Sequence, residues 1–188
     1  MLDLGAGTGD LSREALRQSP GTRVTAADFT IDMMLVGRGQ PGLAPNWAGA
    51  DALCLPFPDA TFDALVSGFL LRNVVDLSGA LKEQYRVLKP GGRLVALDTT
   101  RPRKSLLSPF IRFHMHRVIP FLGGLMAGSR DAYVYLPSTT ESFLLAEDLQ
   151  AQIEACGFEK AGFRRLMFGA VAIHWAAKPA KRAYNNPS

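Results

Sequence analysis

Hydrophobic and polar positions follow two different periods along the chain. Short apolar runs predict buried strands, and segments whose apolar residues recur at three- and four-residue spacing predict helices. Strands are expected at 1–4, 23–28, 46–51, 62–70, 93–98, 158–168 and 170–177, and helices at 10–19, 30–38, 76–88 and 145–156. Strands that alternate with helices indicate an α/β fold, in which a doubly wound, mostly parallel sheet carries helices on both faces.

The helix at 76–88 has the clearest boundaries. Asp76 is a favourable N-cap, and the run Lys89-Pro90-Gly91-Gly92 predicts the stop, because it cannot continue a helix. A long irregular middle follows the strand at 93–98, and the tail 178–188 is expected to fray. The whole chain, 1–188, fits a single domain, since a domain usually takes about 100–200 residues.

Composition excludes several classes of protein. Hydrophobic residues make up 47% of the chain and charged residues 20%, which excludes a disordered protein. The two cysteines, Cys54 and Cys156, form no CxxC pair, so we expect neither a disulfide framework nor a metal site. No run reaches the roughly 18 apolar residues of a membrane-spanning helix. Two plain thiols suit a reducing compartment, and the expected location is cytoplasmic.

A glycine cluster links the first predicted strand to the first helix. Gly5, Gly7 and Gly9 permit a tight turn and a close approach of a ligand, and the helix start offers free N–H groups to an anion. The spacing GxGxG lacks the third glycine of a dinucleotide fold, and no Gly-Lys-Ser/Thr follows to make a phosphate loop. By itself the pattern also fits an ordinary strand-to-helix turn.

Carboxylates at the ends of the next two strands strengthen the case for a ligand. Asp28 ends the second strand, nineteen residues after Gly9, where a carboxylate can accept both hydroxyls of a ribose. Asp51 ends the third strand, where it can meet an adenine amino group. Each acid alone fits a surface cap, but three acids at three consecutive strand ends, Asp3, Asp28 and Asp51, beside the glycine loop predict a site for a nucleoside-type cofactor.

The string LDLGAGTGDLS at residues 2–12 resembles the first motif of class I S-adenosylmethionine-dependent methyltransferases. More specifically, the chain resembles the ubiquinone/menaquinone biosynthesis C-methyltransferases, through strings that run in the family's order along nearly the whole chain: DALCLPFPDATFDALVSGFLLRNVVD, YRVLKPGGRLVALD, YVYLPST, CGF and GAVAIH. Arg72-Asn73-Val74, with Tyr133-x-Tyr135-Leu136, is the more specific part. The resemblance implies a Rossmann-like seven-stranded sheet whose last strand is antiparallel.

The resemblance also implies roles for individual residues. Gly5, Gly7 and Thr8 would line the methionine part of S-adenosylmethionine, and Asp28 would hold its ribose. Asp51 with Ala52 would hold the adenine. Gly68 stands where the family usually has Ser, so it would contact the cofactor through its backbone only. Leu70 stands where the family usually has Gly, and we expect it to narrow the pocket.

The front of the chain also departs from the family. Family chains usually carry several tens of residues before the glycine motif, whereas Met1 stands here where Val is common. Our hypothesis is that a valine codon was read as a start and that the natural chain is longer. The alternative is a true truncated protein.

Methylation of a ring carbon requires a group that activates or stabilises a phenolate. Arg72 could stabilise it because a guanidinium stays charged, and Asn73 could orient a hydroxyl or a water. The alternative for Arg72 is a pair with an acid such as Asp76. Tyr133 and Tyr135 could line the ring pocket or simply pack. His114 and His116 fit solvated roles and His174 a structural role, so no residue is assigned as general base.

The middle of the chain combines basic and apolar residues. Residues 99–130 hold six basic residues and no acid, a pattern typical of a segment at an anionic lipid surface. The alternative is a lid whose apolar face is buried inside the protein. Aromatic residues do not alternate with the basic ones as a stacking platform would require, so a nucleic-acid partner is not expected.

These observations lead to one preferred function and two alternatives. The preferred function is C-methylation of a polyprenyl quinol, demethylmenaquinol above all or the equivalent ubiquinone precursor, by an enzyme peripheral to the inner face of the membrane. The alternatives are a methyltransferase for another small or lipid substrate and an inactive, truncated cofactor-binding module. The oligomeric state is left open, a homodimer included.

Overall fold

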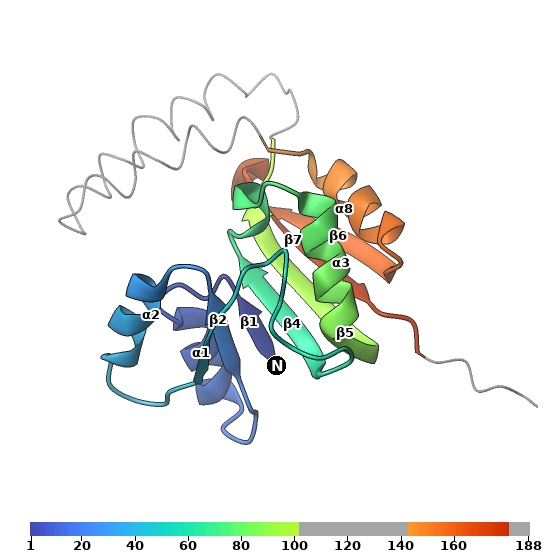
Figure 1. Ribbon diagram of the computed structural model, residues 1–188. Coiled ribbons are helices and arrows are strands. Elements are labelled where there is room, and N and C mark those ends of the chain that lie inside the picture. The colour runs from blue at the N-terminus through green and yellow to red at the C-terminus, as the bar shows by residue number, and fades with distance from the viewer. Residues whose placement is uncertain (102–142, 181–188) are drawn as a thin grey trace, which may run out of the picture.

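A single mixed sheet forms the centre of the protein (Figure 1). The computed structural model describes residues 1–101 and 143–180. The strands of this part are β1 Leu2–Leu4, β2 Thr25–Asp28, β3 Asn46–Gly49, β4 Phe62–Gly68, β5 Leu88–Thr99, β6 Glu159–Leu166 and β7 Val171–Ala177. The helices are α1 Asp10–Gln18, α2 Ile31–Arg38, α3 Leu77–Val87 and α8 Ala146–Ala155, with short 3₁₀ turns at Leu71–Asn73 and Met167–Gly169.

The seven strands lie in the order β3-β2-β1-β4-β5-β7-β6. Strands β1 to β5 pair in parallel, and β7 runs antiparallel to both β5 and β6. This confirms the expected doubly wound sheet with an antiparallel last strand. The chain moves outward in one direction from β1 to β3 and in the other direction from β4 onward, so the order reverses between β1 and β4. Such a reversal opens a crevice at the carboxyl ends of the strands.

The helices lie on both faces of the sheet. Parallel crossovers are right-handed, so α1, between β1 and β2, and α3, between β4 and β5, must lie on opposite faces, because the two crossovers run in opposite directions. Figure 1 shows α3 and α8 in front of the sheet and α1 behind it. Two apolar layers are therefore buried, one on each side of the strands.

The core is built mainly from the central strands. Leu2 and Leu65 are fully buried neighbours on β1 and β4, and Leu94 on β5 continues the same layer. Helix α3 packs onto this sheet through residues spaced three and four apart, Ala80, Leu81, Gln84 and Val87, all of them buried. The Asp76 side chain accepts a hydrogen bond of 2.9 Å from the Gly79 N–H, so Asp76 is the N-cap that the sequence predicts.

Two boundaries differ from the expectations. Strand β5 begins at Leu88, so it includes the Pro-Gly-Gly run that was expected only to stop the preceding helix. The reason is pairing on both sides of this segment: Leu88 pairs with Phe62 on β4, Gly91 N donates to Lys178 O, and Lys178 N donates to Gly92 O. Lys178 is therefore not frayed as expected, and its ammonium also donates to the carbonyls of Tyr85, Arg86 and Leu88 at the end of α3.

Several expectations lie outside the described residues. These are the basic apolar segment from residue 102 onward with His114 and His116, the two tyrosines Tyr133 and Tyr135, and the tail 181–188. In the part that the structure describes, no helix is long and apolar enough to cross a membrane.

Candidate active site

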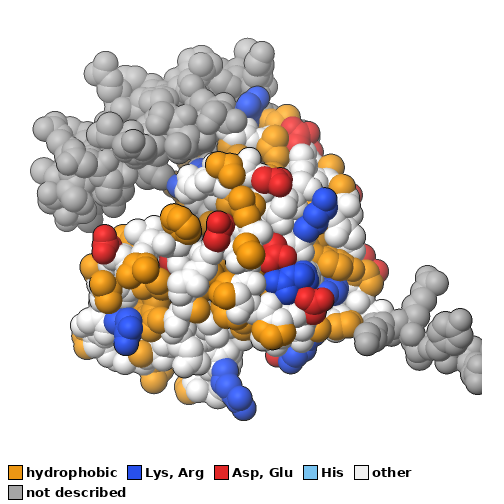
Figure 2. Space-filling model, viewed as in Figure 1, with side chains coloured by type: hydrophobic (Ala, Val, Ile, Leu, Met, Phe, Trp, Pro, Cys, Tyr) orange, Lys and Arg blue, Asp and Glu red, His pale blue; other side chains and the backbone are white. Residues whose placement is uncertain are grey.

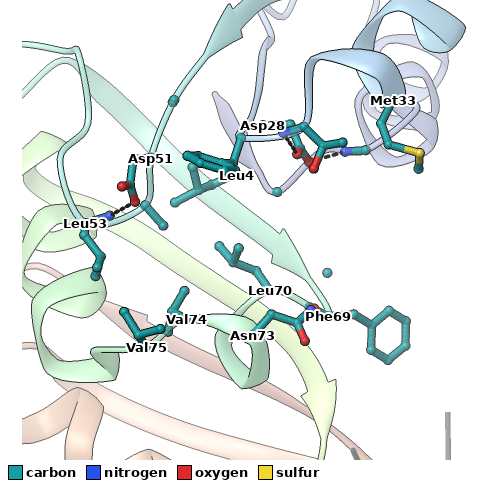
Figure 3. Close-up of a pocket in the computed structure, with 17 residues that line it drawn as sticks. Leu4, Asp28, Met33, Asp51, Leu53, Phe69, Leu70, Asn73, Val74 and Val75 are labelled. Atoms are coloured by element: carbon teal, nitrogen blue, oxygen red, sulfur yellow. Dashed lines mark hydrogen bonds between the residues drawn. The ribbon is translucent and has the colours of Figure 1, made fainter. Parts of the chain in front are cut away.

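A pocket of about 510 Å³ lies in the crevice between β1 and β4, at the carboxyl ends of the parallel strands. Its walls come from the loops that follow β1, β2, β3 and β4. The lining residues are Leu4, Gly5, Gly7, Asp28, Phe29, Thr30, Met33, Ala50, Asp51, Ala52, Leu53, Gly68, Phe69, Leu70, Asn73, Val74 and Val75. Figure 3 shows Asp28 and Asp51 on one side and the segment from Phe69 to Val75 on the other.

The glycine loop takes backbone conformations that only glycine adopts freely. Gly5, Gly7 and Gly9 have φ angles of +73°, +56° and +80°. The indole of Trp47 on β3 packs so closely on Gly9 that a Cβ there would lie 2.6 Å from the ring. The loop is thus held between a strand end and an aromatic side chain, which brings its backbone to the pocket wall.

Asp28 connects the glycine loop with the end of β2. Its Oδ2 accepts a hydrogen bond of 2.7 Å from Gly7 N, and its Oδ1 accepts one of 2.7 Å from Thr30 N. Each carboxylate oxygen has a second lone pair, so both can still accept a hydroxyl from a ligand. The carboxylate is half-buried at the pocket wall, where a ribose diol would find two acceptors already oriented by the backbone.

Asp51 supplies the second acid, further along the same wall. It follows β3, and its Oδ1 accepts a hydrogen bond of 2.9 Å from Leu53 N, which fixes the carboxylate at the start of a short turn. Ala52 and Leu53 form an apolar surface next to it. An exposed carboxylate beside apolar side chains is suited to a flat base with an exocyclic amino group.

The opposite wall is formed by the turn after β4. Leu70 lies on the glycine loop, since a Cβ on Gly5 would meet its side chain at 3.0–3.4 Å. Asn73 also faces the pocket, and its Nδ2 donates to Phe69 O at 3.0 Å. Leu70 therefore narrows the pocket where the glycine loop and this turn meet, as its place in the sequence led us to expect.

Arg72 lies behind this wall and is not a lining residue. Its Nη1 forms an ion pair of 3.2 Å with Asp98 Oδ1 at the end of β5, and its guanidinium stacks over the Phe69 ring, 4.7 Å from the centroid. The alternative expected for Arg72, a pair with an acid, is confirmed, but the acid is Asp98 and not Asp76, whose carboxylate caps α3. The proposed role of Arg72 at a phenolate stays a prediction.

A further acid lies beneath the glycine loop. Asp3 on β1 is 1% exposed, and its Oδ2 accepts a hydrogen bond of 2.6 Å from the Ser12 hydroxyl on α1. Burial raises the pKa of Asp3, and the hydrogen bond from Ser12 opposes that shift. Asp3 thus ties β1 to α1 on either side of the loop, and it does not line the pocket beside Asp28 and Asp51, with which the sequence grouped it.

The structure gathers most of the predicted cofactor residues in one pocket. Gly5, Gly7, Asp28, Asp51, Ala52 and Gly68 all line it, and so does Asn73. Thr8 does not line it, and its hydroxyl donates to Asp10 Oδ2 at 2.8 Å at the start of α1.

Sequence reasoning missed the apolar residues that follow Asp28. Phe29 and Met33 line the pocket although both are exposed, and Phe29 is 76% exposed. Figure 2 shows hydrophobic side chains exposed over α2, the helix that carries Met33. The sequence did contain a signal for Phe29. An aromatic residue that directly follows an acid at the end of a strand is poorly placed for the core and well placed for a ligand.

The polar and apolar groups that line the pocket fit S-adenosylmethionine. Two carboxylates suit its ribose and adenine, close backbone at Gly5 and Gly7 suits its methionine part, and apolar side chains such as Leu53 suit the faces of the base. Within residues 1–101 and 143–180, no group of three or more His, Cys, Asp or Glu side chains could hold a metal ion.

Comparison with known sequences agrees with this geometry. The sequence profile of the ubiE/COQ5 methyltransferase family matches residues 1–178. A protein of Thermus thermophilus named demethylmenaquinone methyltransferase is 44% identical over 95% of this chain and 82% of its own length. A protein of Desulfotalea psychrophila named ubiquinone/menaquinone biosynthesis C-methyltransferase UbiE is 42% identical over 95% of this chain and 73% of its own length.

Solved structures with the same fold are more distant in sequence. Phosphoethanolamine N-methyltransferase 2 of Haemonchus contortus, in complex with S-adenosyl-L-methionine, superposes with a TM-score of 0.69 at 16% identity, over 95% of this chain and 48% of that chain. Human N-acetylserotonin methyltransferase, also in complex with S-adenosylmethionine, gives 0.66 at 20% identity, over 96% of this chain and 47% of that chain. At these identities the likeness concerns the fold alone.

Proposed function

The chain belongs to the ubiE/COQ5 methyltransferase family, and from that premise we propose that it methylates a ring carbon of a polyprenyl quinol with S-adenosylmethionine as donor. Demethylmenaquinol is the preferred substrate, since relatives that share 44% and 39% identity over 95% of the chain carry the name demethylmenaquinone methyltransferase. The observation that carries the proposal is that the pocket has two different walls. One wall bears the acids Asp28 and Asp51, which suit a nucleoside, and the other is a mostly apolar turn that bears Asn73.

The first task of the chain is to bind and orient the donor. Asp28 is proposed to accept both ribose hydroxyls, with its own position fixed by Gly7 and Thr30. Asp51 and Ala52 are proposed to hold the adenine, Gly5 and Gly7 the methionine part, and Gly68 to contact the cofactor through its backbone. The bound donor supplies a methyl group activated by a positively charged sulfur. Alignment of donor and acceptor is the main contribution that a protein makes to such a transfer.

The second task is to favour negative charge on the ring. Loss of a proton from a ring hydroxyl raises the electron density at the neighbouring carbon, which is the position to be methylated. Asn73 is proposed to orient that hydroxyl or a water from its place in the pocket wall. Arg72, 12% exposed behind the same wall, is proposed to stabilise the developing phenolate through its fixed charge. Tyr133 and Tyr135 are proposed to line the ring site.

Contact with a membrane follows from the chemistry of the substrate. A polyprenyl tail partitions into lipid, so the enzyme must meet its quinol at a bilayer surface. The basic and apolar composition of residues 99–130 supports peripheral binding to anionic lipid at the inner face of the membrane. A homodimer is compatible with this arrangement.

Quinone analysis of a deletion strain tests the proposed substrate. Mass spectrometry of extracted quinones should show that a species lighter by one methylene group replaces the mature quinone, and the intact gene should restore the mature form. Unchanged quinones in the deletion strain would contradict the proposal and favour the alternative, a methyltransferase for another small or lipid molecule.

A further inference from the structure

We infer that Asp98 is a positioning residue for the reaction: from outside the pocket it fixes Arg72, and through Arg72 the strained turn that carries Phe69, Leu70 and Asn73 to the pocket wall. The inference rests on the proposed function for its kinetic consequences. Its structural part, the ordering of the turn by Asp98, stands on the contacts alone.

Asp98 is buried at the end of β5 and receives three hydrogen bonds. Its Oδ2 accepts from Arg72 N at 3.2 Å, and its Oδ1 accepts from Arg72 Nη1 at 3.2 Å and from Thr99 N at 2.7 Å. The carboxylate is 1% exposed. One side chain thus holds Arg72 at both its backbone and its guanidinium, 26 residues away along the chain. This double attachment fixes the position of the residue as well as the direction of its side chain.

The turn that Asp98 holds is strained. Phe69 has a φ angle of +59°, a left-handed conformation that a bulky L-residue rarely adopts. Such a residue persists only where its surroundings impose the conformation, and these sites gather near functional pockets. Here the Phe69 N–H donates to Leu97 O at 2.7 Å, and the Arg72 guanidinium covers the Phe69 ring. Both restraints originate on the last residues of β5, one directly and the other through Asp98.

The restrained turn delivers side chains to the pocket. Asn73 N donates to Leu70 O at 2.9 Å, and Asn73 Nδ2 donates to Phe69 O at 3.0 Å, so these bonds tie Phe69, Leu70 and Asn73 together. Leu70 packs on Gly5 of the cofactor loop. Neither Asp98 nor Arg72 lines the pocket in this arrangement, whereas Phe69, Leu70 and Asn73 do. Among the described residues, Asp98 therefore reaches the pocket wall through Arg72 and the turn.

The charge of Asp98 depends on the same contacts. Burial raises the pKa of the Asp98 carboxyl, while the Thr99 N–H and the Arg72 charge oppose that shift. Removal of the carboxylate charge leaves a nearly buried guanidinium without its partner, and such a charge tends to move toward water. The movement would remove the cover from the Phe69 ring and release the turn.

Hydrogen exchange measures the structural part without any assay of activity. In Asp98→Asn, the peptide that spans residues 69–74 should exchange its amide hydrogens at least about tenfold faster than in the wild type. Asp63→Asn is the matched control, because Asp63 also pairs with a cation, Lys89, but is exposed and lies outside the pocket. Unchanged exchange at 69–74 in Asp98→Asn would overturn the inference, whatever the substrate proves to be.

Kinetics of a double-mutant cycle test the second part. Asp98→Asn should lower kcat for methylation of demethylmenaquinol by about tenfold or more, with the cofactor Kd within about threefold of the wild type. Arg72→Leu should lower kcat by about 10²-fold. Because Asp98 acts through Arg72, the double variant should be no worse than Arg72→Leu alone. Multiplied losses, or a normal kcat in Asp98→Asn, would overturn the inference.

These experiments distinguish a failure of the proposed function from a failure of the inference about Asp98. A wild type that transfers no methyl group to the quinol contradicts the proposed function, and the exchange data still decide the role of Asp98. If Asp98→Asn does not fold, Arg72→Lys replaces it: this variant keeps the charge but loses the planar group that spans Asp98 and Phe69. Its peptide 69–74 should exchange faster and its kcat should fall, and wild-type values for both would overturn the inference.

Discussion

The Asp28 carboxylate accepts a hydrogen bond of 2.7 Å from the backbone N–H of Gly7, 21 residues before it in the chain. The bond joins the end of β2 to the loop after β1, so the residue proposed to bind the ribose also orders the loop proposed to bind the methionine part. Loss of Asp28 should therefore affect the cofactor at two places.

Replacement of Asp28 should weaken cofactor binding strongly. Hydrogen bonds to a charged group contribute roughly 1.5–3 kcal/mol each, so Asp28→Ala should raise the Kd for S-adenosylmethionine at least tenfold in calorimetry. Asp28→Asn keeps an acceptor for the Gly7 N–H, and should lose less affinity than Ala. Asp32→Ala is the control, since Asp32 is exposed on the adjacent helix and does not line the pocket. Unchanged affinity in folded Asp28→Ala would remove Asp28 from the site.

A methyl group added at Gly37 on α2 should disturb the glycine loop through Thr8 and Trp47. A Cβ at this position would lie 2.4 Å from Thr8 O and 2.5 Å from the Trp47 ring. Gly37→Ala should lower the free energy of unfolding by about 1–3 kcal/mol, as overpacked cores do, and should also weaken cofactor binding. Gly21→Ala is the matched control, because nothing lies within 4 Å of its Cβ position. Equal stability of the two variants in denaturant unfolding would contradict this account of the loop.

His174 should make stability depend on pH in the acid range. Its Nε2 lies 3.0 Å from Ala146 O, and burial lowers the pKa of the imidazole below the usual 6.5. The unfolded chain then binds more protons than the folded chain as pH falls through 6.5 toward the folded pKa, so stability is lost in that window. The free energy of unfolding should fall between about pH 7 and pH 5, by at most about 1.4 kcal/mol per pH unit from this group.

The variant His174→Phe separates this effect from other titrations. It should show a smaller loss of stability between the same two pH values, measured by denaturant unfolding. A wild type and a variant with the same pH dependence would show that the pKa of His174 does not differ between the folded and the unfolded chain.

Membrane binding should depend on the basic middle of the sequence. Each basic residue near an anionic surface contributes up to roughly 1 kcal/mol, so Arg112→Glu with Arg117→Glu should release the protein from anionic vesicles in a sedimentation assay. Added salt should weaken binding of the wild type. Arg23→Glu with Arg93→Glu reverses two exposed charges, one just before β2 and one in the middle of β5, and should leave vesicle binding intact. If the wild type binds neither anionic nor neutral vesicles, the result would favour the alternative, in which residues 99–130 are an internal lid.

The pocket that gathers Gly5, Gly7, Asp28 and Asp51 could be predicted because parallel strands end at one edge of the sheet. Asp28 and Asp51 lie far apart in the sequence, but each follows an apolar run, and adjacent parallel strands bring such positions together. The glycine loop could be recognised because its φ angles require glycine at Gly5, Gly7 and Gly9. Residue types and their positions after apolar runs were therefore sufficient for most of that prediction.

The acceptor side depends on contacts that the sequence does not encode locally. The Arg72–Asp98 pair exists because β4 and β5 pair in a register that sets Gly68 beside Leu97. The early start of β5 likewise comes from its pairing with Phe62 and Lys178, a tertiary effect that overrides the local preference of Pro90 and Gly91 for a turn. Asp76 was the nearer candidate partner for Arg72 in the sequence, but its carboxylate is used by the helix N-terminus.

Direct transfer of a labelled methyl group tests the central claim. Purified protein is incubated with methyl-labelled S-adenosylmethionine and demethylmenaquinol in anionic vesicles, and the extracted quinones are analysed by mass spectrometry. The account predicts a product that carries the label on a ring carbon, formed by the wild type and strongly reduced in Asp28→Ala. A label that stays on the donor, or that appears on a ring oxygen instead of a ring carbon, would contradict it.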